Sequence, residues 1–141
     1  MSSDFKRLQP VHRLALMREN RSAREMAIAN SRLQSEKEKL SDLMTYRGEY
    51  DQSVRKSGAT GMQLRGAYAF LAQLCTAIEL QEKQLRDGEE SLSRETELWL
   101  ALKADRKAIE RLIEKRQTKT RMRLENREQD QMDERARRSY H

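Results

Sequence analysis

Residue types that support catalysis or metal binding are few and scattered in this chain. The two histidines, His12 and His141, lie far apart in the sequence, and neither has a cysteine or carboxylate at the spacing of a metal site. We expect both to be solvated. No basic residue adjoins Cys75, which is therefore expected to be a small packing residue and not a reactive thiol. The paired acids Glu89 and Glu90 are expected on a solvated helix face. We predict a non-enzymatic protein without catalytic residues, metal or cofactor.

A glycine-containing segment, Ser57-Gly58-Ala59-Thr60-Gly61-Met62, is the only loop of this kind in the chain. It lacks the Gly-Lys-Ser/Thr ending with which a nucleotide-binding loop holds phosphate. Gly58 fits the left-handed residue that commonly follows a helix. Thr60 and Gln63 have the spacing of a capping box that begins the next helix. We therefore predict a turn over residues 57–61 between two helices.

The composition indicates long helices. Of the 141 residues, 37% are charged, 36% are hydrophobic and 5% are aromatic, with five glycines and one proline. A compact globule needs more apolar side chains, and its separate elements need more turn residues. Sandwiches, barrels and doubly wound sheets are therefore excluded.

The second half of the chain carries two rows of heptad-spaced residues. The first row consists of Leu64, Leu71, Ile78, Leu85, Leu92 and Trp99, and it resumes at Ile113 after an interruption at Arg106. The second row follows three residues later and consists of Ala67, Leu74, Gln81, Gly88, Glu95, Leu102 and Ile109. A seven-residue period held over this length is typical of a helix that coils around another helix.

The first half has matching rows. One consists of Met26, Leu33, Leu40 and Val54, with Arg47 as an interruption, and its companion consists of Ala29, Leu43 and Tyr50. Nearer the N-terminus, Val11, Leu14 and Met17 are expected to continue the apolar face in a shifted register.

These rows predict an all-α fold, an antiparallel two-helix coiled-coil hairpin that forms a single domain over residues 1–141. The first helix is expected over about residues 10–56, with Pro10 in its first turn, where a missing N–H costs nothing. The second is expected over about residues 62–138 and overhangs the first at the C-terminus. A short connection makes the two helices antiparallel neighbours.

Charge is unevenly distributed and indicates an acidic partner surface. The net charge is +6, and between Lys6 and Arg24 the chain has six basic residues against one acidic residue, Glu19. The longest charge-free stretch near the middle, residues 66–78, is shorter than the ~20 residues of a membrane span. With no apolar leader at the N-terminus, we expect a cytoplasmic protein without direct membrane insertion.

A second apolar stripe lies beside the main rows. It consists of Phe70, Leu74, Ala77 and Gln81. One interpretation is a wider core near the turn, with Tyr46 and Tyr50 packed across it. The other is an exposed stripe that binds a partner.

Several segments together resemble the FliJ family of flagellar export proteins over nearly the whole chain. The segments are Leu43-x-x-Tyr46-Arg47-x-Glu49-Tyr50, the short glycine-containing turn, Leu64-x3-Tyr68-x-Phe70-Leu71-x2-Leu74-x2-Ala77-Ile78-x2-Gln81, and Glu128-Gln129-x2-Met132-Asp133-Glu134-x-Ala136. The resemblance implies a hairpin similar to the two long helices of a rotary ATPase γ subunit.

The resemblance also implies partners. They are the central pore of a hexameric export ATPase (FliI-like), the cytoplasmic linker of the membrane export gate (FlhA-like) and the chaperones of export substrates, at the cytoplasmic side of the inner membrane. The gate-binding stripe would be Phe70, Leu74, Ala77 and Gln81. Candidates for the contact with acidic loops of the ATPase ring are Arg13, Arg18, Arg21, Arg24, Arg116, Arg121 and Arg123.

Three alternatives remain open from the sequence. A stalk protein of a virulence type III secretion system would share the fold. A basic coiled coil that binds nucleic acid is disfavoured, because acidic residues alternate with the basic ones along both helices and no stripe of unpaired cations appears. A tethering homodimer is disfavoured by the short turn, which favours pairing within one chain. We therefore expect protein partners and no nucleic acid.

Overall fold

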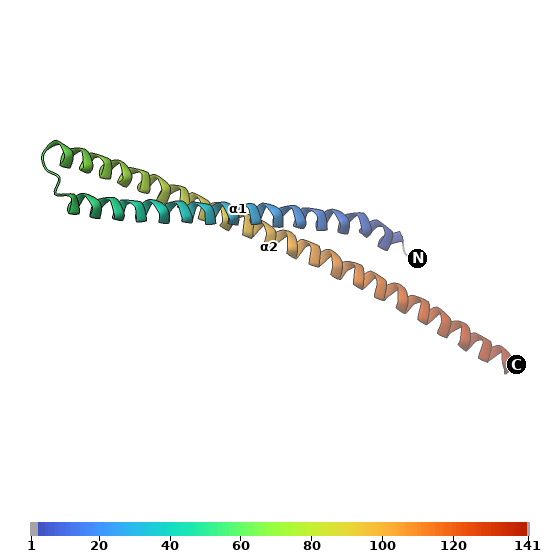
Figure 1. Ribbon diagram of the computed structural model, residues 1–141. Helices are drawn as coiled ribbons and strands as arrows, with labels where there is room; N and C mark the ends of the chain where they lie inside the picture. Colours follow the sequence, from blue (N-terminus) through green and yellow to red (C-terminus); the bar gives the residue numbers. More distant parts are fainter. Residues whose placement is uncertain (1–2, 141) are drawn as a thin grey trace. The chain divides into compact units, whose positions relative to one another are not determined.

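The computed structural model describes residues 3–140 and contains two helices. Helix α1 is Ser3–Ser57 and helix α2 is Met62–Ser139, and residues 58–61 connect them (Figure 1). The two helices pack against each other in antiparallel directions, and no strand occurs within residues 3–140. The predicted helical hairpin is confirmed.

The chain divides into two units. One unit, which we call the turn unit, is Ala23–Leu98 and contains the connection with the adjoining parts of both helices. The other, which we call the terminal unit, comprises the described parts of Met1–Ser22 and Trp99–His141. Within residues 3–140, neither helix has a stretch that is both long and apolar enough to cross a bilayer.

Helix α1 ends through a glycine and a serine hydroxyl. Gly58 has a φ of 67°, the left-handed conformation that an L side chain rarely adopts, as expected for the residue after a helix. The hydroxyl of Ser57 donates to the carbonyl of Val54 at 2.7 Å and accepts from the N–H of Ala59 at 3.3 Å. The side chain of Ser57 therefore provides hydrogen bonds to the backbone at the C-terminal end of α1.

Helix α2 begins at Met62, as predicted, but without the expected cap. The expected capping box of Thr60 and Gln63 does not form, since the hydroxyl of Thr60 has no hydrogen-bond partner among the described residues. Instead Gly61, with a φ of 61°, directly precedes the helix, and its carbonyl accepts from the N–H of Arg65 at 3.1 Å. A second left-handed glycine turns the chain here, so the start of α2 lies one residue later than a cap at Thr60 would place it.

The core of the turn unit is the seam between the predicted heptad rows. In α1 the buried or half-buried row residues are Met26, Ala29, Leu33, Glu36, Leu40, Leu43, Arg47, Tyr50 and Val54. In α2 they are Leu64, Ala67, Leu71, Leu74, Ile78, Gln81, Leu85, Gly88, Leu92 and Glu95. The predicted rows are confirmed. The polar interruptions of the rows in this unit, Arg47, Gln81 and Glu95, lie within the seam and do not end it. Leu33 packs so near Gly88 that a Cβ there would lie 3.4 Å from its methyl group.

The terminal unit keeps the same register, and here the prediction was wrong. The α1 positions that are buried or half-buried are His12, Ala15, Glu19 and Ser22, which continue the heptad backward from Met26. Val11, Leu14 and Met17 are exposed instead, with 46%, 47% and 62% of their surface accessible. The register holds because polar side chains of α2 face the polar α1 positions, as described below.

The two ends of the terminal unit also differ from a simple hairpin. Helix α1 begins at Ser3, so Pro10 lies inside it and not in its first turn. Every described residue of α2 after Thr120 is exposed. That segment continues beyond the part of α2 that α1 covers.

Alanine in place of the exposed helix glycines should stabilise the fold. A Cβ at Gly48 or Gly66 would have no other atom within 4 Å. We expect Gly48→Ala and Gly66→Ala each to raise the free energy of unfolding by about 0.5–1 kcal/mol, measured by urea denaturation followed by circular dichroism.

The control for these variants is Gly58→Ala, at the left-handed position. A side chain there is strained by about 1–2 kcal/mol, so this variant should be less stable than the wild type. Equal effects of all three substitutions would contradict the observed turn.

Candidate functional site

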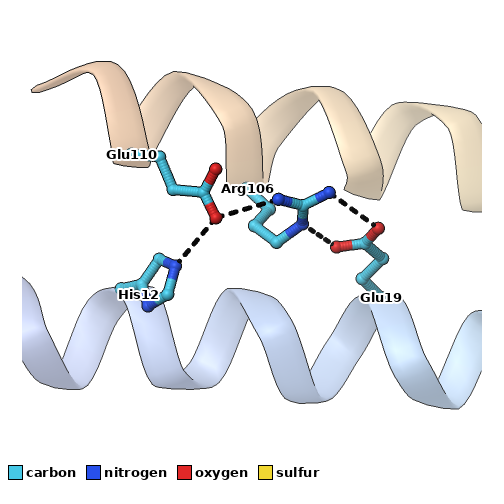
Figure 2. Close-up of polar contacts among 4 residues, drawn as sticks. All are labelled: His12, Glu19, Arg106 and Glu110. Carbon is cyan, nitrogen blue, oxygen red and sulfur yellow. Dashed lines mark hydrogen bonds and ion pairs between the residues drawn. The ribbon is translucent and has the colours of Figure 1, made fainter.

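A polar cluster joins the two helices in the terminal unit (Figure 2). Arg106 of α2 donates from Nε and Nη2 to the carboxylate of Glu19 in α1, the second of these bonds being 3.3 Å long. It also donates from Nη1 to Glu110 Oε1 at 2.8 Å, one turn along α2. The same oxygen accepts from Nε2 of His12 at 3.1 Å. Four side chains from two helices thus form one continuous chain of hydrogen bonds.

Three residues of the cluster, His12, Glu19 and Arg106, lie at seam positions, and the charges of the cluster stabilise each other. Only 10% of the Glu19 side chain and 18% of the Arg106 side chain are exposed. The hydrogen bonds that Arg106 donates to Glu19 first and to Glu110 second raise the pKa of its guanidinium further above the ordinary value. The hydrogen bond from His12, followed by that from Arg106, lowers the pKa of the Glu110 carboxyl below its ordinary value.

This arrangement positions the helices and offers no catalytic geometry. The forked guanidinium of Arg106 holds one carboxylate from each helix, so it specifies which turn of α1 faces which turn of α2. No group of three or more metal-ligating side chains occurs among the described residues. His12 was predicted to be solvated, and this was wrong, because the heptad places it at the seam beside Glu110.

Sequence reasoning missed the cluster, although one signal for it exists. Arg106 was noted only as an interruption of an apolar row. The heptad that contains Leu33 and Met26 also reaches Glu19 and His12 when it is extended backward in steps of seven. An arginine in one row and an acid in the facing row together indicate an interhelical ion pair.

Removal of Glu19 should destabilise the hairpin. Glu19→Ala leaves Arg106 shielded from water with one carboxylate fewer, so we expect a loss of about 1–3 kcal/mol in the free energy of unfolding. Chemical denaturation at pH 7 measures this loss. The matched control is Glu25→Ala, which removes an exposed glutamate of α1 that has no ion-pair partner among the described residues and should change stability little. Equal effects of both variants would contradict a structural role for the cluster.

The contribution of Glu110 should depend on pH in a defined direction. Because its pKa is lowered in the folded state, the stability it contributes is fully present above its ordinary pKa of 4.5 and is lost as the pH falls through the lowered value. We expect Glu110→Gln to lower the melting temperature at pH 7, and the difference from wild type to shrink as the pH falls below 4.5 and through the lowered pKa of Glu110. Thermal melts at a series of pH values measure this difference. A difference that grows as the pH falls would contradict the assigned contacts.

A second polar contact lies in the seam of the turn unit. The amide of Gln81 donates to the backbone carbonyl of Glu36 at 3.1 Å and also to the Glu36 carboxylate. Lys39 pairs with the other oxygen of that carboxylate at 3.7 Å. Gln81 is buried, and the contact provides the hydrogen bonds that its amide needs in the seam.

The aromatic residues near the turn form a cluster. The ring of Phe70 lies 4.8 Å from that of Tyr50 and 6.3 Å, edge to face, from that of Tyr46 (distances between ring centres). The packing of both tyrosines across Phe70, one of the two interpretations of this region, is therefore observed. Of the other residues in the predicted gate-binding stripe, Leu74 and Gln81 are buried in the seam and Ala77 is exposed. Phe70 itself is half-buried.

The arginines predicted to contact the ATPase ring lie mostly at the surface. In the terminal unit Arg13, Arg18, Arg21, Arg121 and Arg123 are exposed and Arg116 is half-buried, and in the turn unit Arg24 is exposed. Within residues 3–140, none of the six exposed arginines takes part in an ion pair.

Cys75 is exposed and not a packing residue, and Nη1 of Arg47 lies 4.0 Å from its sulfur, so the expectation that no basic group adjoins it was wrong. Arg47 reaches Cys75 from the other helix, which the local sequence does not reveal. His141 lies outside the described residues.

Comparison with known families identifies the hairpin. A sequence model of the family described as "Flagellar FliJ protein" matches residues 5–141, nearly the whole chain. The chain belongs to the FliJ family. Comparisons with curated proteins and with solved structures gave no match. The FliJ family is a non-enzymatic component of flagellar protein export, so membership gives this chain a role related to flagellar export.

Proposed function

We propose that this FliJ-family chain acts as a γ-subunit-like stalk that links the hexameric export ATPase to the cytoplasmic linker of the membrane export gate, and that it also handles export chaperones. In this role it works through contacts alone and catalyses no reaction. It acts in the cytoplasm, beside the inner membrane at the flagellar export apparatus.

The ATPase contact is supported by the burial of the Glu19 side chain and the exposure of basic side chains on α1 in the terminal unit. Glu19 is the only acid between Lys6 and Arg24. It is buried and bound to Arg106 across the seam. The exposed charged residues of α1 between Lys6 and Ser22 are therefore all basic, among them Arg13, Arg18 and Arg21. Such a surface attracts acidic loops and raises the rate at which they associate.

The overhang of α2 adds to the basic surface in the same unit. Arg121 and Arg123 lie just beyond Thr120, on the segment that α1 does not cover, and both are exposed. We include them, with Arg116 and with Arg24 of the turn unit, in the contact with the ATPase ring. An uncovered helix segment with exposed cations is available to a surrounding ring of acidic loops.

The gate contact is assigned to the stripe of Phe70, Leu74, Ala77 and Gln81. Tyr46 and Tyr50 hold Phe70 in place, which lowers the entropy lost when a partner covers its exposed edge. Ala77 has an exposed methyl group about two turns along the helix from Phe70. Leu74 and Gln81 are buried in the seam, and their packing fixes the position of the helix segment that carries Phe70 and Ala77.

Reversal of charge on α1 tests the ATPase contact. We expect the triple variant Arg13→Glu, Arg18→Glu and Arg21→Glu to bind a purified FliI-like hexameric ATPase at least about tenfold more weakly, because three exposed cations become anions. Surface plasmon resonance at low and high salt measures the loss, and wild-type affinity should fall as salt rises.

The matched control makes the same charge change in the turn unit. Arg65, Arg86 and Arg94 are exposed arginines without ion-pair partners among the described residues. Their replacement by glutamate should leave ATPase binding nearly unchanged. Equal losses in both variants would show a response to net charge alone and would contradict the proposed surface.

The gate contact has its own test. We expect Ala77→Glu to weaken binding to the purified cytoplasmic linker of the gate by at least about tenfold, since it places a charge on an exposed apolar surface, while helicity by circular dichroism stays at the wild-type level. The control is Ala72→Glu, at an exposed position on another face of α2. Unchanged binding by Ala77→Glu would rule out the stripe as the gate contact.

A further inference from the structure

An open groove runs between the two helices of the terminal unit, to one side of the polar cluster. Its volume is about 340 Å³. It is lined by Val11, Leu14 and Arg18 of α1 and by Leu102, Asp105 and Ile109 of α2, together with an alanine from each helix. Both helices contribute apolar side chains to its floor, so the groove is a feature of the pair and not of either helix alone.

Two apolar residues of the groove, Val11 and Leu14, take no part in the packing of the hairpin. Val11 and Leu14 lie outside the seam, which passes through His12, Ala15 and Glu19, and nearly half of each side chain's surface is exposed. On α2, Leu112 follows Asp105 by two turns on the same face and is also exposed. Large apolar side chains left exposed beside a two-helix seam are typical of the surface that a third helix covers.

The charges around the groove favour an acidic occupant. Arg7, Arg18 and Arg21 share the face of α1 that carries Val11 and Leu14, because they follow the same alternation of three and four residues. All three arginines are exposed. On the α2 side the lining contains one acid, Asp105. A second copy of this chain would bring the same surplus of cations to the groove, which disfavours self-association there.

We propose that this groove binds one amphipathic helix of a partner protein, with leucine-like side chains on one face and aspartate or glutamate along its edges. The helix lies between α1 and α2 and completes a local three-helix bundle. Its apolar face covers Val11, Leu14 and Leu112, and its acidic edge pairs with Arg18 and Arg21. Binding of such a helix is a property of the groove and requires no contact with the ATPase ring or the gate.

A synthetic peptide tests the proposal with the full-length chain. The probe is a fluorescein-labelled three-heptad peptide with leucine at the a and d positions and glutamate at the e and g positions, measured by fluorescence anisotropy. We expect Leu14→Asn to weaken binding at least about tenfold and Arg18→Glu at least about fivefold. The matched controls, Leu16→Asn and Arg13→Glu, change exposed residues on other faces of α1 and should bind as the wild type does.

The outcomes separate the groove from the other sites. A peptide with lysine in place of glutamate should bind at least about tenfold more weakly than the acidic peptide. Equal binding of the two peptides, or no effect of Leu14→Asn, would overturn the proposal. A chain that dimerises in sedimentation velocity and becomes monomeric with Leu14→Asn would also overturn it, in favour of a second copy. Because Arg13 belongs to the ATPase contact but not to the groove, Arg13→Glu distinguishes failure of that contact from failure of this one.

Discussion

The heptad period is the constraint on which the rest of this structure depends. Shielded side chains alternate at steps of three and four from His12 to Val54 in α1 and from Leu64 to Thr120 in α2. A helix that keeps this period must present one continuous edge to its neighbour, whatever residue types occupy it. Residues outside that edge, such as Val11 and the exposed arginines, are not constrained by the pairing of the helices.

Polar residues within the edge give the pairing its specificity. Two carboxylates of different helices converge on Arg106, and the amide of Gln81 reaches the backbone of Glu36. Buried polar contacts of this kind add little net stability compared with apolar packing, but they penalise pairings in which their groups are left without partners. In this chain they also turn Glu19 inward, and the basic character of the outer surface follows from that inward contact.

The sequence was sufficient to predict the hairpin, because the leucine rows and the glycine at position 58 are local signals with a direct physical meaning. It was insufficient in the terminal unit, where the packed positions are polar. There the apolar residues Val11 and Leu14 suggested a changed register, whereas ion pairing between residues 87 positions apart maintains the original one. The thiol of Cys75 is a similar case, since its basic neighbour comes from the other helix. The capping-box motif at Thr60 also gave a wrong prediction, because the conformation of Gly61 determines how α2 begins.

The contact of Leu33 with Gly88 has a consequence for sliding of the helices in the turn unit. The missing side chain at position 88 leaves room for one leucine. A slip of α2 by one heptad in either direction would bring Gln81 or Glu95 to that place, and each would project a long polar side chain into the space that Leu33 now fills. A single small residue in a row of larger ones therefore acts against translation along the helix axis, and it does so through shape, without any charge.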